Sequence, residues 1–170
     1  MGVATGESDM MRVGFGYDSH RFCEGDHLMM GGVRIPHKAG FSAHSDGDVL
    51  LHALADALLG AAALGDLGQH FPDTDPQYAG ADSADLVRHI LQLLAERSFA
   101  INNIDATIIA ELPKFLPHIT PIRQSMADIV GLPISQVSVK ATTNEKMGWL
   151  GRSEGIAVHV VTLVSSAESS

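Results

Sequence analysis

Apolar residues recur along the chain with two different periods, and each period predicts its own kind of element. In 45–60, and again from 82 or 83 to 98, they return every three or four positions, which is typical of an amphipathic helix. A third helix is predicted over 117–130, because Gly131 follows its last apolar turn. Short β-branched or alternating runs predict strands. These strands span 11–18, 104–111, 137–141 and 156–164.

Turn-forming residues divide the rest of the chain. Gly31 and Gly32 separate two apolar runs, 28–30 and 33–35, and two consecutive glycines suit a tight hairpin turn. The segment 65–80 is rich in Gly, Pro and Asp, so it is predicted to be a loop. Long ordered loops in small domains are usually functional, which makes this one a candidate for substrate contacts.

The order of these elements predicts an α/β chain of the α+β kind. We expect a single domain in which helices pack on one face of a mixed β-sheet. Ser45 is the predicted N-cap of the first helix. A flexible N-terminal extension is expected over 1–11, the folded domain over 12–164 and a flexible tail over 165–170.

The charge balance argues against one large class of partner. The chain has 170 residues, with 11 Lys and Arg against 20 Asp and Glu, and a net charge of −9. Such a protein lacks the broad basic face that binds nucleic acid, although a small phosphate pocket with local cations remains compatible with it. We expect no membrane span and no secretory signal. Cys23 is the only cysteine, so no internal disulfide is expected, and we predict a cytoplasmic protein.

An Asp-x-His segment and one helix position provide candidate metal ligands. Asp18 and His20 alternate on an extended segment, so their side chains point to the same face. His52 lies four residues after Asp48 and four before Asp56, on one stripe of an otherwise apolar helix. Asp18, His20 and His52 would form a site with one open position, as in a catalytic zinc centre. We hypothesise that Asp56 or Asp48 orients the His52 ring. The alternative is a solvated helical face with a hydrogen-bonded histidine.

Two further regions suit phosphate oxygens or a base. Residues 141–146 and 148–152 place consecutive hydroxyls, an acidic residue and two cations beside glycines, and this set can bind phosphate and a divalent ion. A polar turn between two strands would have a similar composition. Residues 110–116 offer backbone groups around Pro113 and one cation, Lys114, although this segment by itself is a strand end and a turn.

Residues 12–164 resemble the 2-C-methyl-D-erythritol 2,4-cyclodiphosphate synthase family. Four stretches carry the resemblance in the same order: GGVRIP, AHSDGDVLLHALADALLGAAALGDLGQHFPDTD, IIAELPKFLPHI and VKATTNEKMGWLGRSEGIAV. The resemblance implies a phosphorus–oxygen lyase of the non-mevalonate isoprenoid pathway. In the implied reaction, the 2-phosphate of 4-diphosphocytidyl-2-C-methyl-D-erythritol 2-phosphate attacks the β-phosphate. The products would be the 2,4-cyclodiphosphate and CMP.

The resemblance also implies roles for individual residues. The implied metal ligands are Asp18, His20 and His52 for Zn²⁺ and Glu145 for Mg²⁺ or Mn²⁺. His44 and Thr143 would be the catalytic residues that stabilise the transition state. The implied substrate-binding positions are Asp18, Ser19, His20, His44, Ser45, Asp66, Leu67, Gly68, Phe71, Pro72, Asp73, Thr74, Asp75, Ala110, Glu111, Leu112, Pro113, Lys114, Phe115, Leu116, Thr142, Thr143, Asn144, Glu145, Trp149 and Arg152.

The assembly implied by the resemblance is a homotrimer with each active site at a subunit boundary. For the cytidine diphosphate substrate, one chain would then supply the zinc site and its neighbour the cytidine pocket. Some family members take an isoprenoid diphosphate in the central cavity. His159 stands where an acidic residue is usual, so it either meets an anion there or is an ordinary strand histidine. Asn144, Trp149 and Leu150 also depart from the usual residues of the family.

Two other functions compete with the synthase. A zinc phosphohydrolase would use the open metal position to activate water and would release a linear phosphate. A non-catalytic trimer would only bind isoprenoid diphosphates or a pathway partner. Loss of the implied metal ligands would favour this last function, but all of them are present at 18, 20, 52 and 145.

Overall fold

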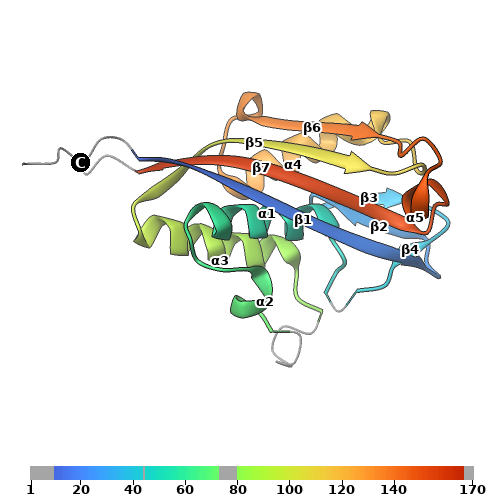
Figure 1. Cartoon of the computed structure of the whole chain (residues 1–170), viewed down its shortest axis with the longest axis horizontal. Coiled ribbons are helices and arrows are strands. Elements are labelled where there is room, and N and C mark those ends of the chain that lie inside the picture. The colour runs from blue at the N-terminus through green and yellow to red at the C-terminus, as the bar shows by residue number, and fades with distance from the viewer. Residues whose placement is uncertain (1–9, 44, 73–79, 167–170) are drawn as a thin grey trace, which may run out of the picture.

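The backbone forms one five-stranded sheet and a separate two-stranded hairpin (Figure 1). The computed structural model describes residues 10–43, 45–72 and 80–166. The large sheet contains, in spatial order, β4 (Gly40–Phe41), β1 (Met11–Cys23), β7 (Gly155–Ser166), β5 (Phe99–Ile109) and β6 (Val137–Thr142). The hairpin consists of β2 (His27–Met30) and β3 (Val33–Pro36). The helices are α1 (Val49–Ala61), α2 (Leu67–His70), α3 (Ser83–Glu96), α4 (Ile119–Val130) and α5 (Gly148–Gly151). Within these described ranges, no helix is long and apolar enough to cross a membrane.

The large sheet is mixed, as the sequence predicts. β1 pairs antiparallel with β4 and β7, and β7 pairs antiparallel with β5. β5 and β6 are parallel, and α4 lies in the crossover connection that a parallel pair requires. The long β1–β7 pairing runs from Met11 with Ser165 to Arg21 with Gly155. Ser165 is therefore part of the sheet, although it was assigned to the tail.

Two glycines let α1 lie directly against β1. A Cβ atom at Gly14 would stand 1.8 Å from the carbonyl oxygen of Ala57, and one at Gly16 would stand 1.8 Å from that of Ala53. No side chain fits in that space, so these positions of β1 need glycine for the helix to approach so closely. Helices α1 and α3 lie on the same side of the sheet (Figure 1). The next residues of β1 that point to this side are 18 and 20, which therefore face α1.

Asp48 joins the β2–β3 turn to the start of α1. Gly31 and Gly32 have φ angles of 62° and 78°. A type I′ hairpin turn requires positive φ at both central residues, and glycine adopts it without strain. Both glycine amides donate to the Asp48 carboxylate, at 2.8 and 2.6 Å. The Leu51 amide donates to the same carboxylate at 3.0 Å, so Asp48 is the N-cap of α1.

Several observed boundaries differ from the predicted ones. α1 begins at Val49 rather than at Ser45, because the Asp48 carboxylate takes the free amides of the first turn. The predicted loop 65–80 contains one helical turn, α2, which is capped by Asp66. Three other features were not predicted: β1 continues to Cys23, β5 begins at Phe99, and α5 forms a short helix. The longer strands are explained by pairing with β7 and, at Phe22 and Cys23, with β4, and local propensity does not reveal this pairing.

The face of the sheet opposite α1 carries exposed apolar side chains. Met11, Val13, Phe15 and Tyr17 alternate along β1 and are 67%, 68%, 58% and 45% exposed. Val161 of β7 lies opposite Phe15 and is 43% exposed. An apolar patch of this kind on a globular domain usually marks a contact surface. We call this patch, made of these five residues, the open face.

Candidate active site

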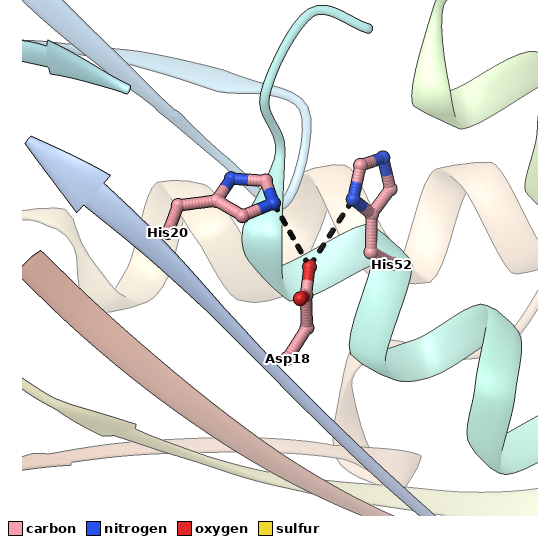
Figure 2. A group of neighbouring side chains, drawn as sticks. All are labelled: Asp18, His20 and His52. Carbon is pink, nitrogen blue, oxygen red and sulfur yellow. Dashed lines mark hydrogen bonds and ion pairs between the residues drawn. The ribbon is translucent and has the colours of Figure 1, made fainter. Parts of the chain in front are cut away.

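Three side chains from β1 and α1 converge on one point (Figure 2). His20 Nε2 lies 3.1 Å from Asp18 Oδ2, and His52 Nδ1 lies 3.2 Å from the same oxygen. One ligand atom from each residue lies within 4.8 Å of the other two. The structure thus brings together the three residues that the sequence predicts as metal ligands.

The donor set of Asp18, His20 and His52 fits a divalent metal ion. Two imidazole nitrogens and one carboxylate oxygen are ordinary ligands of zinc, and three protein ligands leave one coordination position for another molecule. The three side chains are largely buried, with 26%, 11% and 15% of Asp18, His20 and His52 exposed. A largely buried group of this kind holds a cation more firmly than a solvated surface cluster, because water screens its charges less.

The charges of the three residues support one another. Burial acts to raise the pKa of Asp18, but the hydrogen bonds and charges of His20 and His52 outweigh it, and the pKa lies well below its usual value. Burial acts to lower the pKa of His20, but the Asp18 carboxylate and the Gly47 carbonyl raise it above its usual value. Without metal, the carboxylate therefore stays ionised and the His20 ring holds a proton readily. A metal ion would have to displace that proton.

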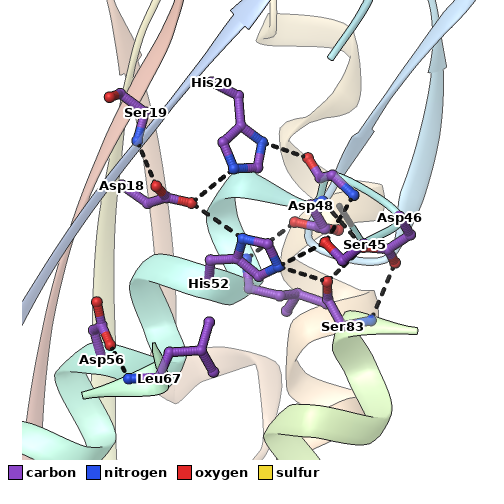
Figure 3. A network of polar contacts seen from close by, with 12 residues as sticks. Asp18, Ser19, His20, Ser45, Asp46, Asp48, His52, Asp56, Leu67 and Ser83 are labelled. Carbon is purple, nitrogen blue, oxygen red and sulfur yellow. Dashed lines mark hydrogen bonds and ion pairs between the residues drawn. The ribbon is translucent and has the colours of Figure 1, made fainter. Parts of the chain in front are cut away.

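Each imidazole is also held at its second nitrogen (Figure 3). His20 Nδ1 lies 3.0 Å from the carbonyl oxygen of Gly47. A carbonyl can only accept, so Nδ1 of His20 donates to it, and in the neutral ring Nε2 keeps the lone pair that a metal ion can bind. His52 Nε2 lies 3.1 Å from Ser45 Oγ and 3.0 Å from Ser83 Oγ. The hydroxyls of two serines therefore surround the outer nitrogen of His52.

The predicted partners of the His52 ring, Asp48 and Asp56, are wrong. In the described part of the chain, neither carboxylate is hydrogen bonded to the ring. Asp48 is fully buried, and its burial raises its pKa although three backbone amides act in the opposite direction. Asp56 accepts from the Leu67 amide at 2.7 Å, and its burial raises its pKa. Both carboxylates are thus bound to backbone amides, which the spacing along one helix could not show.

Asp46 and Ser83 belong to the site but were not predicted. Ser83 donates through Oγ to the Asp46 carboxylate, and Asp46 precedes α1 while Ser83 begins α3. In the sequence, Asp46 and Ser83 each carried only a local signal, because an acidic residue before a helix and a serine at a helix start are both common caps. Their meeting at His52 depends on the packing of α3 beside α1.

The segment after α1 is tied to the metal-ligand group. Asp56 lies one turn after His52 in α1, and its carboxylate accepts the amide of Leu67, the first residue of α2 (Figure 3). The implied substrate residues Asp66, Leu67 and Gly68 form the start of α2. Of those that follow, Phe71 is buried and Pro72 is exposed. His44, Asp73, Thr74 and Asp75 lie outside the described residues, so their implied roles stay predictions.

A hollow of about 260 Å³ lies at the ends of β5 and β6. Its walls are mostly apolar, with hydroxyls and one ammonium group, and its lining consists of Ala110, Pro113, Lys114, Phe115, Leu116, Ile119, Ala141, Thr142 and Thr143. Apolar walls with a few convergent polar groups are typical of a small-ligand site. All of these lining residues except Ile119 and Ala141 are among the implied substrate positions. Leu112, an implied substrate position that does not line the hollow, is 52% exposed.

Glu111 holds the polar turn beside this hollow. Its Oε1 accepts the amides of Asn144 and Lys146, at 3.1 and 3.0 Å. Glu145 and Lys146 have φ angles of 50° and 60°, which cost energy in residues other than glycine. The two bonds to Glu111 stabilise this backbone shape. Thr143 Oγ1 lies 3.5 Å from Glu145 Oε1, so both implied functional groups stand on the turn that Glu111 fixes.

Three implied positions lie near the start of β7 or on β1. Trp149 is in α5 and is 37% exposed. Arg152 donates through Nε to Glu154 at 2.6 Å. The Ser19 amide donates to Asp18 Oδ1 at 2.8 Å, which helps to orient that carboxylate.

In the part of the chain that the structure describes, the metal-ligand group and the hollow lie on different strands of the sheet with core residues between them. Asp18 pairs with Val158, Val158 with Ile108, and Ile108 with Ala141. Asp18 and Ala141 thus share one row of the sheet, three strands apart, or roughly 14 Å at the usual strand spacing. Val158 and Ile108 between them are fully buried in the core. Each chain therefore carries two separate halves of the predicted site.

His159 lies on the same side of the sheet as the open face. Its ring centroid is 5.6 Å from that of Phe15 and 5.1 Å from that of Tyr17. It thus packs between two aromatic side chains of β1. On β5, Asp105 lies opposite Val161 of the open face in the strand register, and its carboxylate forms an ion pair with Lys140.

Comparison with known sequences matches nearly the whole chain. The model of the YgbB family matches residues 11–165. A 2-C-methyl-D-erythritol 2,4-cyclodiphosphate synthase of Pseudomonas aeruginosa (strain UCBPP-PA14) is 62% identical over 154 residues, which are 91% of this chain and 98% of that protein.

Comparison with solved structures gives the same result. The bifunctional IspDF of Campylobacter jejuni has a TM-score of 0.90 and 40% identity over 94% of this chain, which spans 43% of that longer chain. The IspF–CDP complex of Plasmodium falciparum has a TM-score of 0.82 and 30% identity, covering 95% of this chain and all of that one.

Proposed function

The chain belongs to the YgbB family of 2-C-methyl-D-erythritol 2,4-cyclodiphosphate synthases, and from this family we propose how its residues close the cyclic diphosphate. One oxygen of the substrate's 2-phosphate attacks the β-phosphorus of 4-diphosphocytidyl-2-C-methyl-D-erythritol 2-phosphate. The bond from that phosphorus to the oxygen bridging the α- and β-phosphates breaks. CMP leaves with this oxygen and its electron pair, so no water is consumed and the reaction needs no redox partner.

The convergence of Asp18, His20 and His52 carries the proposal. These residues would hold Zn²⁺, which when bound supplies positive charge to phosphate oxygens and makes the phosphorus easier to attack. The protein contributes a preformed set of donors: β1 presents two of them on one face, and α1 presents the third. This arrangement holds the reacting phosphates in place and thereby lowers the entropic cost of bringing them together.

Glu145 would hold the second ion, Mg²⁺ or Mn²⁺. Its carboxylate is exposed on the turn that Glu111 fixes, and carboxylate oxygens are the ligands such hard cations prefer. Thr143 and Lys114 line the adjacent hollow, where their hydroxyl and ammonium groups can donate to phosphate oxygens as negative charge develops. His44 has the same proposed role as Thr143.

The hollow at 110–119 suits the cytidine end of the substrate. Its apolar walls can enclose a planar ring, while the neighbouring backbone and Lys114 provide hydrogen-bonding groups. The CDP-bound relative from Plasmodium falciparum supports a ligand of the cytidine diphosphate type.

A homotrimer would unite the two halves of the site. Asp18 and Ala141 stand roughly 14 Å apart in the sheet of one chain, with buried core between them. The metal-ligand group of one chain must therefore meet the hollow of another chain for both to contact one substrate. The open face provides an apolar surface for such an assembly. An isoprenoid diphosphate at the trimer axis, near Arg152 and His159, stays a prediction.

The test is CMP release from 4-diphosphocytidyl-2-C-methyl-D-erythritol 2-phosphate with magnesium, with the product mass measured before and after zinc removal. We expect CMP together with a cyclic product, lost when zinc is stripped and restored when zinc is returned. No CMP from folded, zinc-loaded protein would overturn the proposed reaction.

The matched control is 4-diphosphocytidyl-2-C-methyl-D-erythritol, which lacks the attacking 2-phosphate. A cyclising enzyme cannot form a cyclic diphosphate from it and should release CMP far more slowly, whereas a phosphohydrolase, whose nucleophile is water, releases CMP and a linear phosphate from both substrates. Running both substrates in ¹⁸O-labelled water adds a second discrimination, because cyclisation incorporates no solvent oxygen and hydrolysis incorporates one.

A further inference from the structure

The outer nitrogen of His52 is in contact with a chain of polar groups that begins at the buried Ser83 (Figure 3). His52 Nε2 lies 3.0 Å from Ser83 Oγ, and Ser83 Oγ donates to the carboxylate of Asp46. Ser83 is 1% exposed, so water does not compete for its hydroxyl. A metal-ligating histidine generally needs an acceptor at its second nitrogen, most often a carboxylate or a carbonyl.

We propose that Ser83 is a positioning residue of the metal centre: its hydroxyl accepts the Nε2 proton of His52 and donates its own proton to Asp46. This hydrogen-bonded chain favours the neutral tautomer with its proton on Nε2, whose Nδ1 lone pair is available to a metal ion. The inference rests on the metal site of the proposed function and deepens it. The serine thus transmits the negative charge of Asp46 to a ring that Asp46 does not touch.

The hydrogen-bond directions favour Ser83 over Ser45 as the acceptor. The single hydroxyl proton of Ser83 is committed to the Asp46 carboxylate, so toward His52 this oxygen can only accept. Ser45 Oγ lies 3.1 Å from His52 Nε2 and accepts the Gly47 amide, and among the described residues no carboxylate accepts its proton. Its proton remains free to be donated, so Ser45 does not define the protonation of the ring.

Asp46 is held firmly enough to act as the anchor of this chain. Its Oδ1 accepts the Asp48 amide at 3.1 Å, and its Oδ2 accepts the Ser83 amide at 3.2 Å. The carboxylate thus joins the start of α1 to the start of α3. Because donors on both helices surround it, the carboxylate cannot rotate away from the serine without losing several hydrogen bonds.

His20 is held in the same way by a simpler partner. Its Nδ1 meets the Gly47 carbonyl directly, which leaves Nε2 for Asp18 and the metal position. The two histidines thus present different nitrogens to the metal, and each has an acceptor at the opposite nitrogen. For His52 that acceptor is a side chain, and only this one can be removed by substitution.

The first measurement reads the tautomer of His52 without any metal. Long-range ¹H–¹⁵N correlation spectra of the ¹⁵N-labelled, zinc-free chain are recorded at a pH where the ring is neutral, and the His52 signals are identified by their loss in His52→Ala. Asp18 competes for the ring proton at Nδ1, so we expect a larger share of the Nε2–H form in the unsubstituted chain than in Ser83→Ala. In Ser83→Ala we expect the proton to move to Nδ1, where the Asp18 carboxylate can accept it.

The second measurement is the zinc dissociation constant from competition with a chelator. Removing the outer partner of a ligating histidine typically weakens metal binding by about 10–100-fold, and we expect a loss of this size in Ser83→Ala. Asp46→Asn keeps the serine but removes the charge, so a smaller loss of about threefold to tenfold is expected. Asp46→Asn also tests the proposal if Ser83→Ala does not fold.

The matched control is Asp82→Ala. Asp82 caps α3 by accepting the Ala84 amide at 2.8 Å, next to Ser83 but without contact to His52. The substitution Asp82→Ala should loosen the start of α3 while leaving the His52 tautomer and the zinc dissociation constant unchanged. An unchanged tautomer in Ser83→Ala, or equal losses of zinc affinity in Ser83→Ala and Asp82→Ala, would overturn the proposal. If the unsubstituted chain bound no zinc, the metal centre of the proposed function would fail, but the tautomer would still decide the role of Ser83.

Discussion

Gly32 donates its amide hydrogen to the carboxylate of Asp48 over 2.6 Å, and this bond links a hairpin turn to the helix that carries His52. The carboxylate also takes the amides of Gly31 and Leu51. One buried side chain therefore sets the position of α1 relative to the β2–β3 hairpin. Four residues later the same helix presents a predicted metal ligand, so the geometry of the site depends on a residue that does not touch the metal position.

Asp48→Ala should destabilise the protein by roughly 2–4 kcal/mol. The substitution removes a helix cap and leaves buried amides without acceptors, and each of these effects costs about 1 kcal/mol or more. Asp82→Ala, which removes only an exposed cap of α3, should cost about 1 kcal/mol. Urea unfolding of both variants gives the comparison, and equal losses would show that the bonds to the turn contribute nothing.

Gly16→Ala should be among the most damaging small substitutions in the chain. The added Cβ would lie 1.8 Å from the Ala53 carbonyl oxygen, so α1 has to move away from β1, at a cost of roughly 3 kcal/mol. The same shift separates His52 from Asp18 and should weaken zinc binding. Gly60→Ala in the same helix is the control: its Cβ meets only Phe15 O at 3.9 Å, and it should stabilise by about 0.5–1 kcal/mol. Thermal unfolding and zinc titration of the pair would contradict this account if the two variants behaved alike.

His52→Ala should abolish zinc retention while leaving the fold largely intact. The side chain supplies one of three ligand atoms, and two remaining ligands hold the ion much less tightly. Elemental analysis after dialysis measures the zinc content per chain, and circular dichroism checks the fold. His27→Ala, which removes a histidine paired with the exposed Asp26, should retain zinc fully. Full zinc occupancy in His52→Ala would remove this residue from the site.

Zinc affinity should fall as the pH is lowered through the raised pKa of His20. A ligating imidazole must be neutral, so below that pKa the metal has to displace a proton, and affinity drops by up to about tenfold per pH unit. In the metal-free protein, folding stability changes with pH in the opposite direction. Protonated His20 stabilises the fold below its unfolded pKa of about 6.5, and this contribution is lost as the pH rises through the folded pKa. Chelator competition and urea unfolding across this range measure the two effects, and a flat affinity profile would contradict the assignment of His20.

Phe15→Glu should dissociate the proposed trimer. The side chain is 58% exposed at the centre of the open face, and an interface would have to bury the new charge without a partner. Light scattering should give about three times the 18.0 kDa chain mass for the unsubstituted protein and a lower mass for the variant. Activity should fall with the mass, because the proposed site needs residues of two chains. Gln92→Glu, on the exposed side of α3, is the control and should leave the mass unchanged.

The positions of the helices and most strands could be predicted because periodicity reports which side of a segment is buried. Alternation along one strand likewise placed Asp18 and His20 on a common face before their partner was known. The same kind of reasoning misplaced Asp48 and Asp56, which share a helical stripe with His52. A buried carboxylate binds the nearest unsatisfied amides, and for Asp48 these come from a turn 17 residues earlier.

The contacts that complete the site depend on elements that meet only in the folded chain. Ser83 lies 31 residues from His52 and 37 from Asp46, and no local pattern connects them. Glu111 reaches the amides of Asn144 and Lys146 in the same way, across 33 and 35 residues. Residue types and spacing predicted Asp18, His20 and His52 as candidate metal ligands beside the alternative of a solvated helical face, and the structure brings the three together. The partners that orient those ligands required the tertiary structure, because a hydrogen bond depends on where two distant backbones are placed by packing.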